Sequence, residues 1–200
     1  MIEGPREATP LQAFWAGADV EVADHPAITQ ALRFNLFHLV QSAGRSGADG
    51  TAAKGLTGEG YEGHCFWDTE AFVLPVLALS RPSLARELIE YRIGHLDQAR
   101  QHARRIGHNS GALYPWRTIG GQECSAHYPT GSAQYHVNAA IAYALEIYFS
   151  ATGDRAIFSE GGAEMLFETA RLWIDTGYFC ERRGGAFVIN GVTGPDEYSA

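Results

Sequence analysis

Two neighbouring carboxylates follow a Gly-Pro bend in the segment Gly194-Pro-Asp-Glu-Tyr198. The bend restricts the backbone, and adjacent side chains at positions 196 and 197 cannot both face one pocket. One of them can therefore hold the loop while the other faces a ligand. A carboxylic acid in an apolar pocket has a raised pKa and can protonate a leaving glycosidic oxygen. From the pattern alone, however, an ordinary Pro-Asp turn is the stronger interpretation.

A second candidate pair is Trp67 and Asp68, which begin a predicted helix after the glycine-rich loop Gly55–His64. An indole face can stack on the apolar face of a pyranose, and a carboxylate can accept hydrogen bonds from two of its hydroxyls. The alternative is that Asp68 caps the helix and Trp67 fills the core. Spacing alone favours this alternative.

Other polar residues give weaker indications. The segment Gly111–Arg117 places an aromatic pair and an Arg on a long loop, and His136 begins an apolar helix. A turn with a surface Arg explains the first equally well, and a lone His at a helix start is more often a structural residue than a ligand. His64, His127 and His136 lack the spacing of metal ligands, and the three cysteines form no Cys-x-x-Cys pair. We therefore predict no metal site.

Composition excludes several classes of partner. The net charge is −8 and no Lys/Arg run occurs, so binding to nucleic acid or to an anionic membrane surface is not expected. No apolar run reaches the roughly 18 residues of a membrane span. The first residues lack the apolar stretch of a signal peptide, which predicts a cytoplasmic location provided that Met1 is the natural start.

Hydrophobic periodicity predicts five helices that could position these groups, near residues 26–40, 67–79, 83–106, 133–151 and 162–176. Asp24 is a candidate cap for the first, and residues 184–192 read as a short hairpin or strand. Long loops on alternate connections indicate stacked helix pairs, either an α/α barrel or an α-solenoid. No fixed sequence repeat is visible, which favours an all-α barrel. Six helix pairs would need about twice as many helices, so we expect an incomplete barrel.

Five motifs in order resemble glycoside hydrolase family 65, the maltose, trehalose and kojibiose phosphorylases. They are the loop and helix start at 55–70, Gly111–Trp116, His136 in its Ala/Ile-rich helix, Glu168-Thr-Ala-Arg171 and Gly194–Tyr198. The resemblance covers nearly all of the chain from Trp15 onward. It implies an (α/α)6 barrel, of which residues 1–200 would be a partial catalytic domain without the flanking β-sandwich and C-terminal segments.

The resemblance also implies roles for individual residues. Trp67 and Asp68 would bind the glucosyl unit, and Glu197 would be the general acid. The implied reaction is inverting phosphorolysis of an α-glucosidic disaccharide to β-glucose 1-phosphate and a free sugar, with inorganic phosphate as co-substrate and no cofactor. Members of the family also suggest a homodimer. Ser199 stands where a His often follows the Tyr, a mild departure.

Two alternatives remain open. A family member that hydrolyses its α-glucoside would share every motif in these 200 residues. A non-catalytic sugar-binding fragment would belong to another class, and the presence of Glu197 together with Trp67 and Asp68 argues against it. The motifs therefore predict a sugar-processing enzyme without identifying its disaccharide.

Overall fold

The structure is a computed structural model that describes residues 9–44, 46–126 and 131–194. Seven α-helices form most of it: α1 (Pro10–Ala18), α2 (Pro26–Ser42), α3 (Leu74–Ser80), α4 (Pro82–Gly94), α5 (Leu96–Arg105), α6 (His136–Thr152) and α7 (Ala163–Thr176). Two strands, β1 (Tyr178–Cys180) and β2 (Ala186–Val188), pair antiparallel. The all-α class is confirmed, and no helix within the described ranges is long and apolar enough to cross a membrane.

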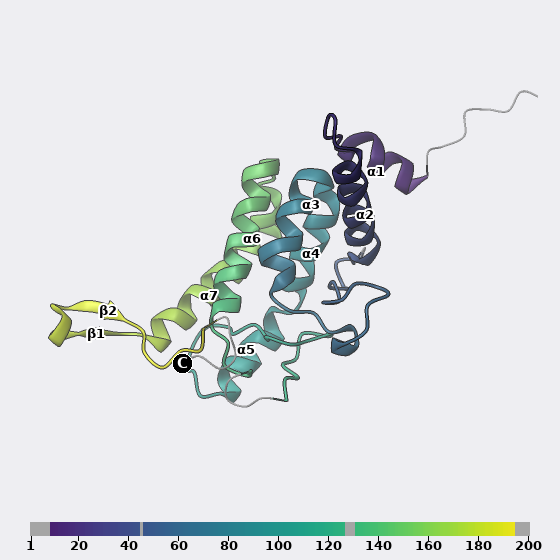
Figure 1. The fold of residues 1–200 in the computed structure, drawn as a ribbon. Coiled ribbons are helices and arrows are strands. Elements are labelled where there is room, and N and C mark those ends of the chain that lie inside the picture. The colour runs from purple at the N-terminus through teal and green to yellow at the C-terminus, as the bar shows by residue number, and fades with distance from the viewer. Residues whose placement is uncertain (1–8, 45, 127–130, 195–200) are drawn as a thin grey trace, which may run out of the picture.

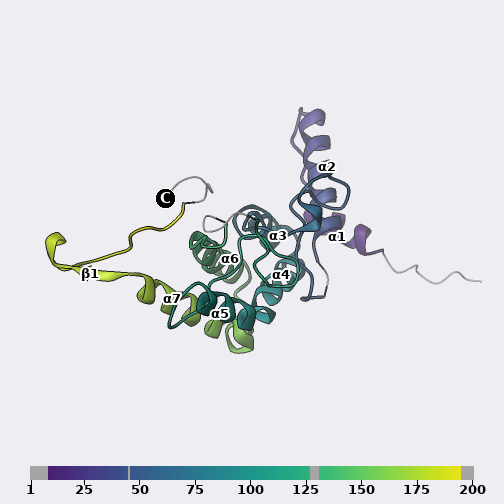
Figure 2. The same cartoon turned by 90° about the horizontal axis from the view of Figure 1, so that it is seen from below.

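The core lies between α3, α4 and α6, which stand side by side (Figures 1 and 2). Leu77, Leu88 and Leu145 contribute side chains that are at most 1% exposed, one from each helix. Met165 of α7 belongs to the same cluster of buried residues. In α4 and α6 the apolar spacing therefore corresponds to the faces that are buried, whereas most apolar residues of α2 are exposed.

Two turns of π-helix lead into α3 and α7. The first, Thr69–Val73, begins the helix predicted at 67–79, and the Leu74 N–H donates to the Thr69 carbonyl five residues back. The second, Phe158–Gly162, precedes α7, and the Ala163 N–H donates to the Phe158 carbonyl, but the chain is kinked there because Glu160 and Gly161 have non-helical backbone angles. A π turn is wider than an α turn and is frequent at functional sites.

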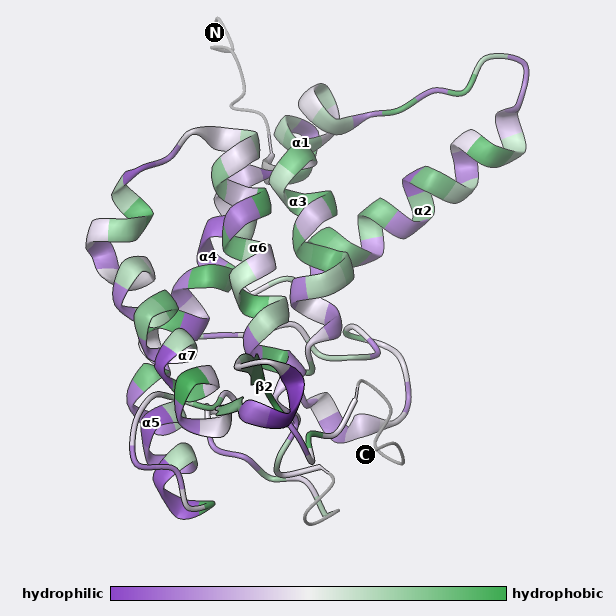
Figure 3. Ribbon diagram, turned by 90° about the vertical axis from the view of Figure 1, so that its left-hand side faces the viewer, coloured by the Kyte–Doolittle hydropathy of each residue, from purple (hydrophilic) through white to green (hydrophobic). Residues whose placement is uncertain are grey.

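The N-terminal helix α1 was not among the predicted helices. It begins with a capping box, in which the Gln12 N–H donates to Thr9 Oγ1 and the Thr9 N–H donates to Gln12 Oε1. Phe14 is 2% exposed and anchors α1 on the core. Figure 3 shows the following helix, α2, running away from the other helices, and its Phe34 is 62% exposed.

The predicted cap at Asp24 is wrong. His25 occupies the N-cap position of α2, and within the described residues no side chain caps this end. Asp24 instead has a φ of 61°, in the left-handed region that Asp tolerates better than most residues. The turn is held by Thr29, whose hydroxyl accepts a hydrogen bond from the Val22 N–H at 3.0 Å.

The single helix predicted for 83–106 is also wrong, because the chain breaks at His95 into α4 and α5. In a continuous helix the His95 N–H would donate to the Tyr91 carbonyl. Here the ring Nδ1 of His95 lies 2.6 Å from that carbonyl oxygen, and the N–H donates to Arg92 instead. The side chain thus competes with the backbone ladder and turns α5 away from α4.

The short β element near 184–192 is confirmed as a hairpin whose first strand begins earlier, at Tyr178. It points away from the helices (Figure 1). Phe179 and Phe187 face each other across the strands, with ring centroids 5.4 Å apart. Such a cross-strand aromatic pair stabilises a hairpin that is otherwise only three residues long.

Candidate active site

A short antiparallel bridge joins the two long loops of the chain. The Cys65 N–H donates to the Thr118 carbonyl at 2.7 Å, and the Thr118 N–H donates back at 3.2 Å. The bridge brings Phe66 against Trp116, edge to face, with ring centroids 5.1 Å apart. The segments around Trp67 and Trp116, more than forty residues apart in sequence, therefore lie next to each other.

A cavity of about 290 Å³ opens between these loops, lined by Ala53, Lys54, Tyr61, Phe66, Trp67, Asp68 and Trp116. The Asp68 side chain is exposed and, among the described residues, makes no capping hydrogen bond to the helix that follows it. The Trp67 ring is half-buried and packs against the core from one side. The capping interpretation of Asp68 is thus wrong, whereas Trp67 both borders the core and lines the cavity.

Charged residues of both signs, Lys54 and Asp68, line the cavity. The Lys54 ammonium lies 5.8 Å from the centroid of the Tyr61 ring. Arg117 and Glu62, which follow the lining residues Trp116 and Tyr61 in sequence, form an ion pair. Tyr61 and Glu62 have φ values of 57° and 44°, so a strained backbone segment borders the cavity. Aromatic faces beside both a carboxylate and an ammonium suit a neutral ligand rich in hydroxyl groups.

His136 contacts the Trp67 ring and is not among the residues that line the cavity. The two rings meet edge to face, with centroids 5.0 Å apart. His136 Nε2 lies 2.7 Å from Oε1 of Gln134, which is 1% exposed. Burial lowers the pKa of His136, which favours the neutral ring. His136 therefore fixes the indole that lines the cavity.

A buried ion pair that the sequence analysis missed anchors the turn carrying Trp67 and Asp68. Glu70 accepts two hydrogen bonds from Arg92, at 2.7 and 2.9 Å, and both side chains are at most 3% exposed. Burial opposes the charged form of Arg92, yet the Glu70 carboxylate outweighs it and raises the pKa of the guanidinium. The Tyr114 hydroxyl also donates to the Arg92 carbonyl, so Arg92 contacts the second loop as well.

Glu123, which the sequence analysis also missed, holds the backbone of Trp116, the second indole that lines the cavity. Its carboxylate accepts hydrogen bonds from the N–H groups of Trp116, Arg117 and Ser125. Burial raises the pKa of Glu123, although these three donors favour the charged form. A carboxylate seven residues along the chain thus fixes the backbone that presents Trp116. Its position in a Gly-rich loop was the one available sequence signal, and it is a weak one.

The proposed acid Glu197 lies outside the described residues. In the ranges that the structure describes, no group of three or more His, Cys, Asp or Glu side chains could hold a metal ion. The cavity therefore presents Trp67, Asp68 and Trp116 together, whereas the predicted general acid stands outside the part of the chain described here.

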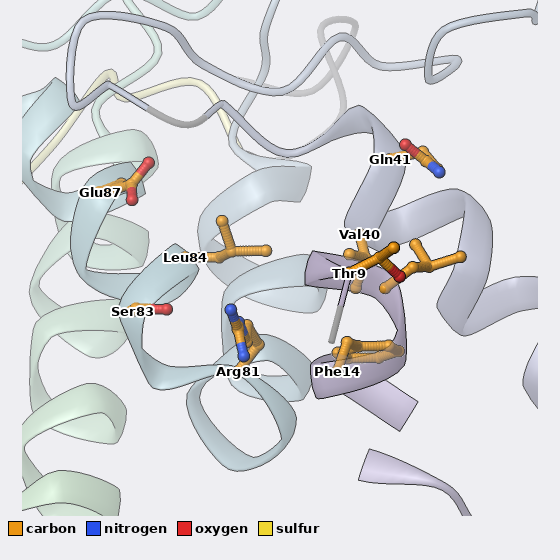
Figure 4. A pocket seen from close by; sticks show the side chains of 9 residues that line it. Thr9, Phe14, Val40, Gln41, Arg81, Ser83, Leu84 and Glu87 are labelled. Atoms are coloured by element: carbon orange, nitrogen blue, oxygen red, sulfur yellow. The ribbon is translucent and has the colours of Figure 1, made fainter. Parts of the chain in front are cut away.

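A second cavity, of about 350 Å³, lies between α1, α2 and the start of α4 (Figure 4). Arg81, Ser83 and Glu87 provide its polar side, and Phe14 and Leu84 its apolar side. None of the predicted sugar-binding residues lines it. The cavity beside Trp67 is therefore the better candidate site.

Comparisons with known proteins agree with the fold. The model of the glycosyl hydrolase family 65 central catalytic domain matches residues 33–200. A solved structure, a putative kojibiose phosphorylase from human microbiome, superposes with a TM-score of 0.82 at 31% identity over 92% of this chain and 24% of its own. The helices are therefore arranged as in part of that protein.

Three curated relatives cover almost the whole chain. The α,α-trehalose phosphorylases of Geobacillus stearothermophilus and Thermoanaerobacter brockii are 54% and 53% identical over 94% and 95% of it. The kojibiose phosphorylase of Thermoanaerobacter brockii is 39% identical over 94%. The chain spans about a quarter of their length, 24–26%. Because the family model matches most of its residues, the chain belongs to glycosyl hydrolase family 65.

Proposed function

We propose that the protein carrying this chain catalyses inverting phosphorolysis of an α-glucosidic disaccharide. The observation that supports it most is the cavity where Trp67, Asp68 and Trp116 meet in a chain of this family. Two indoles offer flat apolar faces to a pyranose, and the exposed carboxylate of Asp68 can accept hydrogen bonds from its hydroxyls. Trp67 and Asp68 would thus bind the glucosyl unit.

In this proposal Glu197 protonates the glycosidic oxygen as the bond to the anomeric carbon breaks. Phosphate attacks the opposite face and inverts the configuration, which gives β-glucose 1-phosphate and a free sugar. A hydrolase needs a second carboxylate to deprotonate water, whereas phosphate is already anionic. One catalytic carboxylate therefore suffices, and the proposal includes no metal or organic cofactor.

Identity to the relatives favours α,α-trehalose as the disaccharide. Two phosphorylases from one organism, Thermoanaerobacter brockii, differ in specificity, and the chain is 53% identical to the trehalose enzyme and 39% identical to the kojibiose enzyme. Because both come from the same organism, this difference does not reflect the distance between species. The cytoplasmic location and the homodimer remain predictions.

The decisive assay offers trehalose, maltose and kojibiose to the protein, with and without orthophosphate. The proposal expects β-glucose 1-phosphate from trehalose and no turnover without phosphate. Glucose release that does not depend on phosphate would support the hydrolase alternative. Turnover of maltose or kojibiose in preference to trehalose would refute the assigned substrate but not the reaction.

Replacing Glu197 with Gln tests the general acid. Sugar binding should persist, because the amide keeps the shape, while turnover of the disaccharide should fall at least about 100-fold, a typical contribution of a positioned proton donor. The loss should be smaller on α-glucosyl fluoride, whose leaving group needs little protonation. Equal losses on both substrates would remove the acid role from Glu197.

A further inference from the structure

Three polar side chains connect the end of α7 to the start of α6. Asp175 Oδ2 lies 2.9 Å from Nδ1 of His108, and His108 Nε2 lies 2.7 Å from the Tyr135 hydroxyl. The Asn109 N–H also donates to Asp175 at 3.1 Å. All three side chains are at least partly buried. None of these three residues is among those that line the cavity beside Trp67.

The placement of Asp175 is unfavourable for its own helix. It lies in the last turn of α7, where the partial negative charge of the helix end repels an anion. Burial alone would raise the pKa of this carboxyl, but the hydrogen bonds with His108, the Asn109 N–H and Ser110 together outweigh burial and lower the pKa. Asp175 is therefore stabilised by its contacts with the segment after α5, and it fixes His108 with Nδ1 as the donor.

The series of contacts that begins at Asp175 ends at Tyr135, at the start of α6. Tyr135 occupies the N-cap position, and in the described residues no side-chain cap bond is made there. The Tyr135 phenol is instead bound by His108. The next residue, His136, presses its ring edge against Trp67 with centroids 5.0 Å apart. A shift in the first turn of α6 would consequently move the support of the Trp67 indole.

We infer that His108 is a positioning residue for the glucosyl site. Asp175 orients its ring, the ring holds Tyr135, and Tyr135 fixes the turn from which His136 supports Trp67. Because a phenol can both donate and accept, the contact persists whether His108 is neutral or protonated. The inference rests on the proposed function, since it assumes that Trp67 binds the sugar.

The test compares two substitutions that each remove one tyrosine hydroxyl, at opposite ends of α6. Tyr135→Phe deletes the contact to His108, whereas the control Tyr148→Phe deletes a 2.8 Å hydrogen bond to Asp154 at the other end of α6. We expect Tyr135→Phe to raise KM for the disaccharide about three- to tenfold with kcat nearly unchanged, because Trp67 contacts ground and transition state alike. Tyr148→Phe should leave KM unchanged.

Two substitutions of His108 separate its contact with Tyr135 from its contact with Asp175. The amide of Gln reaches the position of Nε2, so His108→Gln should keep the contact to Tyr135 and a KM close to that of the wild type. The amide of Asn reaches only the position of Nδ1, so His108→Asn should raise KM as Tyr135→Phe does. Amide hydrogen exchange in residues 136–139 should be faster in His108→Asn than in His108→Gln.

The outcomes separate this inference from the proposed function. A wild-type protein without phosphorylase activity would refute the proposed function. An active wild type in which Tyr135→Phe and Tyr148→Phe behave alike would overturn the inference. Equal KM values and exchange rates for the two His108 variants would overturn it as well.

Discussion

Replacing Glu70 with Gln removes the charge that balances the buried guanidinium of Arg92. The two side chains are 2% and 3% exposed and share hydrogen bonds of 2.7 and 2.9 Å. Arg stays protonated at any ordinary pH, so Arg92 cannot become neutral when its partner carboxylate is removed. The substitution therefore leaves a positive charge in the core without its partner.

The expected loss is about 3–5 kcal/mol of unfolding free energy, because breaking one side of a buried pair leaves the other charge desolvated. The rings of Tyr91 and Tyr114 lie 5.6 and 5.9 Å from the guanidinium carbon and keep part of the attraction. We therefore expect a value near the lower limit. Against a total stability of about 5–15 kcal/mol for a typical domain, this is a large fraction.

Urea denaturation followed by circular dichroism measures the effect. Glu70→Leu combined with Arg92→Met should recover most of the stability, because both charges leave together. The matched control is Asp19→Asn in the Arg33–Asp19 pair, whose side chains are 45% and 40% exposed, respectively. The control should change stability very little. The reasoning fails if Glu70→Gln is no worse than the control, or if the double substitution is no better than Glu70→Gln.

Three further predictions concern the sugar site, a loop and pH. Asp68→Asn should lower kcat/KM for every α-glucoside by weakening charge-assisted hydrogen bonds of about 1.5–3 kcal/mol each; steady-state kinetics that show a loss for one disaccharide alone would contradict this assignment. Gly111→Ala should lower the melting temperature far more than Gly107→Ala. Both have positive φ, but a Cβ at Gly111 would lie 2.3 Å from the Leu172 backbone nitrogen, whereas at Gly107 no described atom lies within 4 Å. Burial lowers the pKa of His102 below its ordinary value of 6.5, so the unfolded chain binds the proton more tightly. Unfolding free energy should therefore fall as pH decreases below about 6.5, and His102→Gln should reduce that slope; an unchanged slope would contradict it.

Helices with a strong local pattern were predictable from the sequence. The end of α6 followed from Thr152 and Gly153, because the glycine adopts a φ of 68° and ends the helix. The break between α4 and α5 was not predictable, since apolar spacing continues through it. His95 leaves the helix where its ring also packs against Gly121, a neighbour that is remote in sequence. Local periodicity cannot report such a contact.

The candidate site was predictable in its residue types but not in its assembly. Trp67 and Trp116 line the same cavity because Cys65 and Thr118 pair, and nothing in the sequence of either loop specifies that bridge. Glu70 was read as part of a motif rather than as a buried charge, since its partner Arg92 lies one helix later. Buried polar pairs depend on tertiary neighbours, so a single sequence gives little indication of them.

The π turn at Thr69–Val73 has a consequence for how members of this family change length. It holds one residue more than an α-helical turn would, and Trp67 and Asp68 lie directly before it. Deleting one residue there would leave α3 intact and restore regular winding, but would rotate the two preceding side chains by about 100° around the helix axis. A relative with one residue fewer at this turn would therefore have a cavity wall that faces another direction. One residue fewer in the preceding glycine-rich loop would only shorten that loop.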